Sequence, residues 1–388
     1  MNLVFLILAV LFLIVNVSLA QTFPIGHTTI TFNDPTRTGG FGSGGGTGRQ
    51  IQSEIYYPGT TSGEDVNLAS GTFPVLIVGH GFVMAWDAYQ NIWEELAPNG
   101  YILVFPRTEG SFTTNHEDFG KDLALCANKM QLEGINSSSL FFNHVINATA
   151  ILGHSMGGGA TMLAAASNSS IQTLVGLAPA ETSPSAIDSA SNITIPALIM
   201  SGSSDGVTPP SDHHLPIYNA LNTTCKYFIS ITGGAHCYFA NSNFNCDFGE
   251  TTSSTGISVT RGEQQTILND YLLKWLDYQL KGNVSAKADF DALLLSDNRI
   301  TYIDNCAPTT LSEKKESTIK IFPNPANNWV TVEFKSPQEC TILITNVLGE
   351  ILNEIPFQGT ITTINTSSWP SGTYFLKTHG KTEKILKL

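Results

Sequence analysis

The sequence has 388 residues, a formal net charge of −13 and only 13% charged residues. Nucleic acids and anionic membrane surfaces are poor partners for such an acidic chain, because both repel negative charge. Residues 311–388 carry eight Lys and seven Glu, a net of +1, so the preceding residues carry −14. The length and this charge asymmetry predict two folded domains.

Residues 1–20 have the features of a signal peptide. Leu3 to Val15 is an apolar run that is shorter than the ~20 residues a membrane-spanning helix needs. Ser18-Leu19-Ala20 forms a small-residue cleavage site before Gln21, although no Lys or Arg precedes the apolar run. We therefore expect a secreted chain with a first folded domain over residues 21–306.

The elements expected in this domain alternate between strand and helix. Residues 23–33 and 50–57 predict antiparallel strands, and the Gly-rich segment 39–48 between them lacks the Lys-Ser/Thr of a phosphate-binding loop. Further strands are expected at 75–79, 101–105, 149–152, 172–178, 197–202 and 226–232, and the clearest amphipathic helix at 261–281. Such alternation predicts an α/β fold with a doubly wound, mostly parallel sheet and helices on both faces.

The motif Gly153-His154-Ser155-Met156-Gly157 follows one of these strands and opens a helix of small residues. A strand, a sharp turn and a helix form the context of a nucleophile elbow, in which the residues two before and two after the serine must be small. Ser155 is therefore the predicted nucleophile. The alternative is a glycine-rich turn that happens to contain a serine.

A nucleophilic serine needs a base and an acid that orients the base. Asp205 and His236 each follow a predicted strand, in the chain order serine, acid, histidine. Glu181 is a rival acid, and His213 and His214 are rival bases that we expect on a solvated helix face. The predicted catalytic residues are Ser155, Asp205 and His236.

The strand at 75–79 ends in Gly79-His80-Gly81-Phe82. Two backbone N–H groups, one after the nucleophile and one after an earlier strand, commonly form the oxyanion hole of such enzymes. The candidates here are the N–H groups of Met156 and Phe82. The ring of Phe82 and the nearby Trp86 are candidate substrate contacts.

These motifs together resemble the α/β-hydrolase superfamily, and more narrowly its cutinase-type polyester hydrolases (PET hydrolases), near the dienelactone-hydrolase and chlorophyllase branch. The resemblance covers roughly residues 23–300 and implies an α/β-hydrolase fold. The best-known members carry a tryptophan where this chain reads Ala178-Pro179-Ala180-Glu181-Thr182. Ala180 and Glu181 thus become candidate substrate contacts, and the negative charge of Glu181 disfavours anionic substrates.

Residues 307–317 predict a linker, and residues 318–388 read as short alternating strands of a small all-β sandwich. This domain resembles the C-terminal sorting domain of the type IX secretion system. The matching segments are Phe322-Pro323-Asn324-Pro325, Asn346 to Glu350, Ser371 to Phe375 and the basic tail from Gly380. The resemblance implies the secretion machinery as a partner and an extracellular or outer-membrane surface location. A polymer-binding module is the alternative.

Six cysteines in an exported chain suggest disulfides. Cys237 and Cys246 are close in sequence and are the predicted pair. At most one further disulfide can form among Cys126, Cys225 and Cys306, and the sequence does not decide which two of them pair. Cys340 is expected to be free. No CxxC or HxxxH spacing occurs, so a metal site is not expected. The predicted triad chemistry needs no cofactor.

The sequence therefore predicts a secreted, monomeric serine ester hydrolase that acts on bulky or polymeric esters, polymer surfaces included. A general carboxylesterase or lipase of small or lipid esters is one alternative. A peptidase or acyltransferase could use the same triad. An alternative of another class is a non-catalytic surface-binding protein on a hydrolase scaffold.

Overall fold

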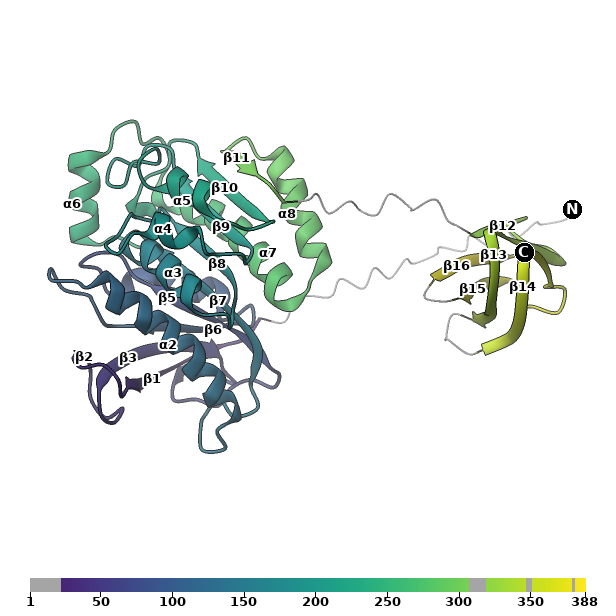
Figure 1. The fold of residues 1–388 in the computed structure, drawn as a ribbon, viewed down its shortest axis with the longest axis horizontal. Helices are drawn as coiled ribbons and strands as arrows, with labels where there is room; N and C mark the ends of the chain where they lie inside the picture. Colours follow the sequence, from purple (N-terminus) through teal and green to yellow (C-terminus); the bar gives the residue numbers. More distant parts are fainter. Residues whose placement is uncertain (1–21, 307–318, 347–350, 379–380) are drawn as a thin grey trace, which may run out of the picture. The chain divides into compact units, whose positions relative to one another are not determined.

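The computed structural model describes residues 22–306, 319–346, 351–378 and 381–388. The chain divides into two compact units, residues 1–308 and 309–388, each with its own core (Figure 1). The predicted signal peptide and linker lie outside the described residues. The predicted domain limits therefore stay a prediction at both places.

The first unit is built on an 11-stranded sheet with the order β11-β10-β9-β8-β7-β5-β6-β3-β1-β4, in which β2 pairs with β3. Neighbours from β10 to β6 along this order are parallel, whereas β3 and β1 extend one side and β11 the other in antiparallel pairing. The strands are β1 (Ile25–Asp34), β2 (Gly40–Phe41), β3 (Arg49–Pro58), β4 (Gly63–Glu64), β5 (Phe73–Gly79), β6 (Ile102–Pro106), β7 (Val145–His154), β8 (Ile171–Leu177), β9 (Ala197–Gly202), β10 (Lys226–Ile231) and β11 (Ile300–Asp304).

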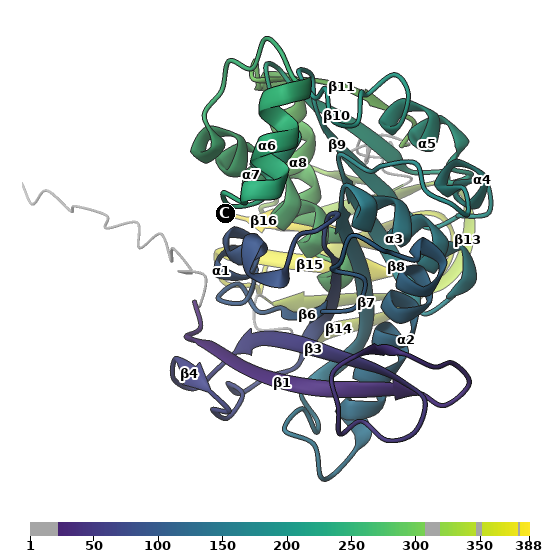
Figure 2. The same cartoon turned by 90° about the vertical axis from the view of Figure 1, so that its left-hand side faces the viewer.

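Helices cover both faces of this sheet and bury two apolar clusters against it (Figure 2). One cluster contains side chains of α1 (Gln90–Leu96), α7 (Arg261–Lys281) and α8 (Val284–Ser296). The other contains side chains of α2 (His116–Ile135), α3 (Met156–Ser167), α4 (Ala186–Ala190) and α5 (His214–Ala220). The predicted doubly wound α/β class is thereby confirmed, and the parallel central strands are buried on both faces as their apolar runs require.

Helix α7 spans the residues predicted for it. It begins at Thr260, whose hydroxyl accepts from the N–H of Glu263 while the Glu263 carboxylate reaches back, a capping box. It ends at Gly282, whose φ of 65° lies in the left-handed region that favours glycine. Trp275 on its buried stripe is 1% exposed, as expected for a core residue. No helix in the described ranges has the length and apolar character needed to cross a membrane.

The second unit is an antiparallel five-stranded sheet, which confirms its all-β class. The long strands β13 and β14 shift their pairing register between Glu333 and Gln338, an irregularity that bends such strands. Alternate side chains such as Val330, Val332 and Ile342 form its own core. Its strands are β12 (Ile319–Phe322), β13 (Trp329–Asn346), β14 (Ile351–Asn365), β15 (Gly372–Thr378) and β16 (Lys381–Lys387).

Two disulfides cross-link the first unit. One joins the predicted pair Cys237 and Cys246, and the other joins Cys225 to Cys306 across a separation of 81 residues. The second bridge ties the start of β10 to the end of β11, its antiparallel neighbour. Cys126 and Cys340 are free thiols.

The two disulfides are expected to differ in their contribution to stability. A bridge that closes a longer loop removes more entropy from the unfolded chain, which gives about 4.5 kcal/mol for Cys225–Cys306 and about 2.6 kcal/mol for Cys237–Cys246. Replacing both partners of each pair by serine should therefore lower the free energy of unfolding more for the Cys225–Cys306 pair. Chemical denaturation of both double variants measures this order, and the reverse order would contradict the entropic account.

Candidate active site

Ser155 stands in a strained turn between β7 and α3. Its φ of 57° and ψ of −121° lie outside the regions that non-glycine residues normally occupy. A Cβ at Gly153 would collide with the Gly157 carbonyl, and a Cβ at Gly157 would collide with the Gly79 carbonyl. The two glycines of the motif are therefore required by close backbone approach, and the turn is the predicted elbow. Ser155 itself is 8% exposed.

His236 and Asp205 meet at the same edge of the sheet, after the carboxyl ends of β10 and β9. The distance from His236 Nδ1 to Asp205 Oδ2 is 2.7 Å. The other carboxylate oxygen of Asp205 accepts from the N–H groups of Val207 at 2.9 Å and Thr208 at 2.8 Å. Burial by itself would raise the pKa of Asp205. The hydrogen bond and charge of His236 act in the opposite direction, and the pKa is lowered overall. Asp205 is thus held as a carboxylate against the ring of His236.

A second histidine, His214, lies close to Asp205 and Thr208. His214 Nδ1 is 2.8 Å from the hydroxyl of Ser201, and its Nε2 is 3.0 Å from the hydroxyl of Thr208, which lies 3.1 Å from Asp205 Oδ2. The prediction that His214 sits on a solvated helix face was wrong, because its side chain is fully buried. His214 is the first residue of α5, and its ring contacts Ser201 of β9. His213 instead accepts from the N–H of Glu181 at 3.0 Å.

A hydrogen-bonded chain connects the three loops around Ser155. The N–H of Gly81 donates to the Tyr89 hydroxyl at 2.7 Å, and that hydroxyl lies 2.9 Å from His154 Nδ1. His154 Nε2 lies 3.0 Å from the carbonyl oxygen of His236. This pattern assigns the proton to Nε2, which donates to the carbonyl, and leaves Nδ1 to accept from Tyr89. His154, the neighbour of Ser155, therefore fixes the His236 loop to the loop that carries Phe82.

Two N–H groups near Ser155 remain available. Neither the N–H of Phe82 nor that of Met156 has a hydrogen-bond partner among the described residues. Met156 is the first residue of α3, where the helix leaves its leading N–H groups without internal partners and carries positive potential. These are the two donors that the sequence predicts for an oxyanion hole.

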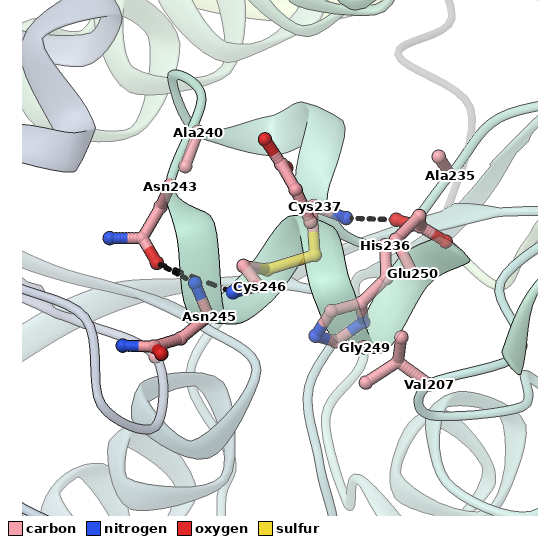
Figure 3. Close-up of a disulfide and its surroundings, with 12 residues drawn as sticks. Val207, Ala235, His236, Cys237, Ala240, Asn243, Asn245, Cys246, Gly249 and Glu250 are labelled. Atoms are coloured by element: carbon pink, nitrogen blue, oxygen red, sulfur yellow. Dashed lines mark hydrogen bonds between the residues drawn. A yellow bond between two sulfur atoms is a disulfide. The ribbon is translucent and has the colours of Figure 1, made fainter. Parts of the chain in front are cut away.

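A disulfide and several hydrogen bonds restrain the loop that follows His236 (Figure 3). The Cys237–Cys246 disulfide joins η2 (Cys237–Phe239) to α6 (Phe244–Ser253), and Glu250 of α6 accepts from the N–H of Cys237 at 2.5 Å. Arg261 donates to the carbonyl oxygens of Cys237 at 2.5 Å and Ala240 at 2.6 Å. These contacts limit how far the ring of His236 can move.

The side chain of Ser155 has no hydrogen-bond partner among the described residues, and neither has Nε2 of His236. Hydrogen bonds between nucleophile and base are often long in unliganded sites and shorten when substrate binds. Within the described ranges the structure therefore shows no hydrogen bond between Ser155 and His236. The structure brings Asp205, and not Glu181, to the ring of His236.

The four predicted substrate contacts differ in their surroundings. Phe82 is 47% exposed, and its ring meets that of Phe112 edge to face at 6.1 Å. Trp86 lines a cavity beside the same loop. Ala180 is half-buried and its N–H donates to the Ser155 carbonyl at 2.9 Å. The carboxylate of Glu181 accepts from the N–H of Ile187 at 3.0 Å at the start of α4.

The structure also contains functional candidates that the sequence did not single out. Thr208 and Tyr89 connect the predicted residues by hydrogen bonds, yet no short motif marks them. Within the described ranges, His, Cys, Asp and Glu side chains do not gather in a group that could hold a metal ion.

Because His154 and His214 are buried, we expect the stability of the protein to depend on pH. Burial lowers the pKa of His154 and of His214 to about 3. An unfolded chain binds protons on these residues near pH 6.5, so between pH 6.5 and 3 the unfolded state binds more protons and stability falls as the pH falls. Each histidine should lower the free energy of unfolding by about 2 kcal/mol when the pH falls from 7 to 5. Urea denaturation at both pH values measures this change. The change in unfolding free energy should be smaller for His214→Gln than for the wild type, and an equal change in both would show that His214 is not its source.

Comparison with known proteins places the chain in a family. Residues 22–258, more than half of the chain, match the family model described as PET hydrolase-like. The chain belongs to this family. Ser155, Asp205 and His236 all lie within the matched residues of this PET hydrolase-like protein.

Named relatives are similar over part of their length. The chain is 26% identical over 212 residues to Cutinase est1 of Thermobifida alba, which covers 54% of this chain and 64% of the relative. It is 27% identical over 218 residues to a bis(hydroxyethyl) terephthalate hydrolase of Streptomyces coelicolor, covering 56% and 59%. A cutinase of Thermobifida fusca is 24% identical over 216 residues, covering 54% and 63%. The matches thus span less than two thirds of these three relatives.

The second unit has a separate match. Residues 320–388 match the family of secretion system C-terminal sorting domains. This confirms the resemblance to the type IX sorting domain, and with it the prediction that the protein is secreted. The alternative of a polymer-binding module finds no support in this match.

Proposed function

We propose that this protein is a secreted carboxylic ester hydrolase that acts through Ser155, His236 and Asp205 and prefers bulky or polymeric esters. The observation that carries the proposal is the buried 2.7 Å contact between His236 and Asp205 beside a strained serine elbow. Membership of the PET hydrolase-like family supports it. Cutinases and a terephthalate ester hydrolase among the relatives support an ester as the substrate.

In the proposed mechanism, Ser155 Oγ attacks the ester carbonyl carbon while Nε2 of His236 takes the hydroxyl proton. Asp205 holds Nδ1–H of His236 and stabilises the ring while it is charged. The carbonyl oxygen becomes an oxyanion and accepts from the N–H groups of Phe82 and Met156, each worth roughly 3 kcal/mol of barrier. His236 then gives its proton to the departing alcohol, which leaves an acyl group on Ser155.

Water completes the cycle through the same residues. His236 removes a proton from water, whose oxygen attacks the acyl carbon, and then returns a proton to Ser155 Oγ as the acid leaves. No step requires a group beyond the chain and water. The neutral rings of His154 and His214 hold the loops and take no part in the proton transfers.

The surface near the site supports bulky substrates. Phe112 is 76% exposed beside Phe82, and Phe244 and Phe248 of α6 are 84% and 64% exposed with stacked rings. Large exposed aromatic side chains are uncommon on a soluble surface and suit apolar ligands. Helix α6 also contacts the Phe82 loop, because Asn245 Nδ2 donates to the Val83 carbonyl at 3.1 Å.

A turnover panel tests the proposal. The mature protein should hydrolyse p-nitrophenyl esters and release soluble acids from polyester films, faster than it cleaves peptide anilides. A higher rate on anilides would favour a peptidase. No turnover of any ester, together with no labelling by a fluorophosphonate probe, would favour the non-catalytic binding protein.

A further inference from the structure

The hydroxyl of Thr208 lies at the meeting point of three buried ionisable side chains. Its oxygen is 3.1 Å from Asp205 Oδ2, 2.8 Å from His236 Nδ1 and 3.0 Å from His214 Nε2. A fourth neighbour, the carbonyl oxygen of Ala178, is more distant at 3.4 Å. A hydroxyl has one proton to donate and two lone pairs that accept. The direction in which Thr208 donates therefore decides which of its atoms faces the carboxylate and which faces the base.

His214 fixes this direction through its own proton. Burial lowers the pKa of His214 to about 3, so the ring is neutral near pH 7 and one of its nitrogens carries the proton. Nε2 lies 3.6 Å from Asp205 Oδ2, whereas Nδ1 lies 2.8 Å from the Ser201 hydroxyl. The negative charge of the carboxylate favours an N–H on the nitrogen that faces it and disfavours a lone pair there. We therefore assign the proton of His214 to Nε2.

With this assignment, three hydrogen bonds run in one direction toward the carboxylate. Ser201 donates to Nδ1 of His214, and Nε2–H of His214 donates to Thr208. The proton of Thr208 then goes to Asp205 Oδ2, and its second lone pair faces Nδ1–H of His236. Hydrogen bonds in such a chain polarise one another, so the last of them is strengthened by those before it.

This arrangement supports the tautomer that the proposed mechanism needs. If Thr208 donated to Nδ1 of His236, the proton of that ring would have to be on Nε2, which then could not accept the proton of Ser155. Because His214 occupies one lone pair and Asp205 takes the proton, Thr208 can only accept from Nδ1–H. The N–H of Thr208 also donates to Asp205 Oδ1 at 2.8 Å, so this residue contacts both oxygens of the carboxylate and limits its rotation.

We propose that Thr208 and His214 are positioning residues of the active site, which together orient the carboxylate of Asp205 and the Nδ1–H of His236. The inference rests on the proposed triad and adds two residues that hold it in its working geometry. His214 acts through Thr208. Both side chains are buried behind the triad acid, so we expect them to affect kcat rather than KM.

Thr208→Val tests this role, because valine keeps the branched shape and removes the hydroxyl. With a p-nitrophenyl ester, kcat should fall about 10- to 100-fold, as expected for a lost hydrogen bond to a charged group, and KM should change less than about threefold. Thr208→Ser keeps the hydroxyl and should retain kcat within about threefold of the wild type. An unchanged kcat in Thr208→Val would overturn the inference.

Thr173→Val is the matched control. Thr173 is also buried, and its hydroxyl lies 2.8 Å from the Pro196 carbonyl oxygen and 3.1 Å from Nε1 of Trp275, near the amino end of β8. This variant loses a buried hydroxyl far along the strand from the triad, so it should lower the free energy of unfolding and leave kcat unchanged. If it lowered kcat as much as Thr208→Val does, the loss would arise from stability and the inference would fail.

A double variant tests whether His214 acts through Thr208. His214→Leu fills the space without a donor and should lower kcat about tenfold in the wild type, but it should cause no further loss when added to Thr208→Val. Circular dichroism checks the folding of each variant. Equal losses in the two backgrounds would remove His214 from the proposal.

A measurement without substrate separates this inference from the proposed function. The Nδ1–H of His236 is held by a buried carboxylate, so its proton should give a far-downfield signal in 1H NMR spectra. The signal should move in Thr208→Val and in His214→Leu, and it should stay in place in Thr208→Ser and Thr173→Val. If the wild type hydrolyses no ester, the proposed function fails while this signal still decides the role of Thr208. If esters are hydrolysed but Thr208→Val changes neither kcat nor the signal, only the positioning role fails.

Discussion

Replacing Ser155 with alanine is expected to lower kcat for ester hydrolysis by about a million-fold, the scale on which removal of a triad serine acts. The reason is that no other hydroxyl stands in the strained turn between β7 and α3. The residual rate should come from substrate binding and from the N–H groups of Phe82 and Met156. Turnover of a p-nitrophenyl ester measures the loss, and a fluorophosphonate probe should no longer label the variant.

Ser167→Ala is the matched control for this experiment. Ser167 is an exposed residue at the other end of α3, where its hydroxyl donates only to carbonyl groups of its own helix. This variant should keep full activity and labelling. If Ser155→Ala retained more than a small fraction of the wild-type rate, Ser155 would not be the nucleophile.

Asp205→Asn is expected to lower kcat by about 10⁴-fold, because an amide cannot hold His236 in the tautomer that leaves Nε2 free to accept a proton. The buried 2.7 Å contact with Nδ1 is the basis of this expectation. The loss should appear at saturating substrate, since Asp205 does not contact the ester. Steady-state kinetics with circular dichroism as a check on folding measure the effect.

Glu181→Gln provides the comparison, because Glu181 is the other acid that the sequence offers. Its carboxylate binds the N–H of Ile187 at the start of α4. The loss of activity should stay within about tenfold, the scale of a lost helix-end interaction rather than of a triad acid. A larger loss from Glu181→Gln than from Asp205→Asn would reverse the assignment.

The sheet and the positions of Ser155, Asp205 and His236 could be predicted because each depends on local sequence. Apolar runs mark the parallel strands, and the residues after their carboxyl ends meet at one edge whatever the length of the connections. The elbow glycines are equally local, since the crowding at Gly153 and Gly157 arises from the turn itself.

Other features depend on contacts between distant segments. They could not be predicted from the sequence or were predicted wrongly. The pairing of Cys225 with Cys306 follows from the antiparallel register of β10 and β11, in which Tyr227 faces Asp304. His214 looked exposed because α5 has only seven residues, too few for a period to show its buried side.

The Cys237–Cys246 bond has a consequence for when the His236 loop becomes fully restrained. Thiols stay reduced in the cytoplasm and oxidise after export. A newly made chain still in the cytoplasm would therefore lack this bond, and only the hydrogen bonds of Glu250, Arg261 and His154 would hold the His236 loop. The loop would reach its full rigidity only after export.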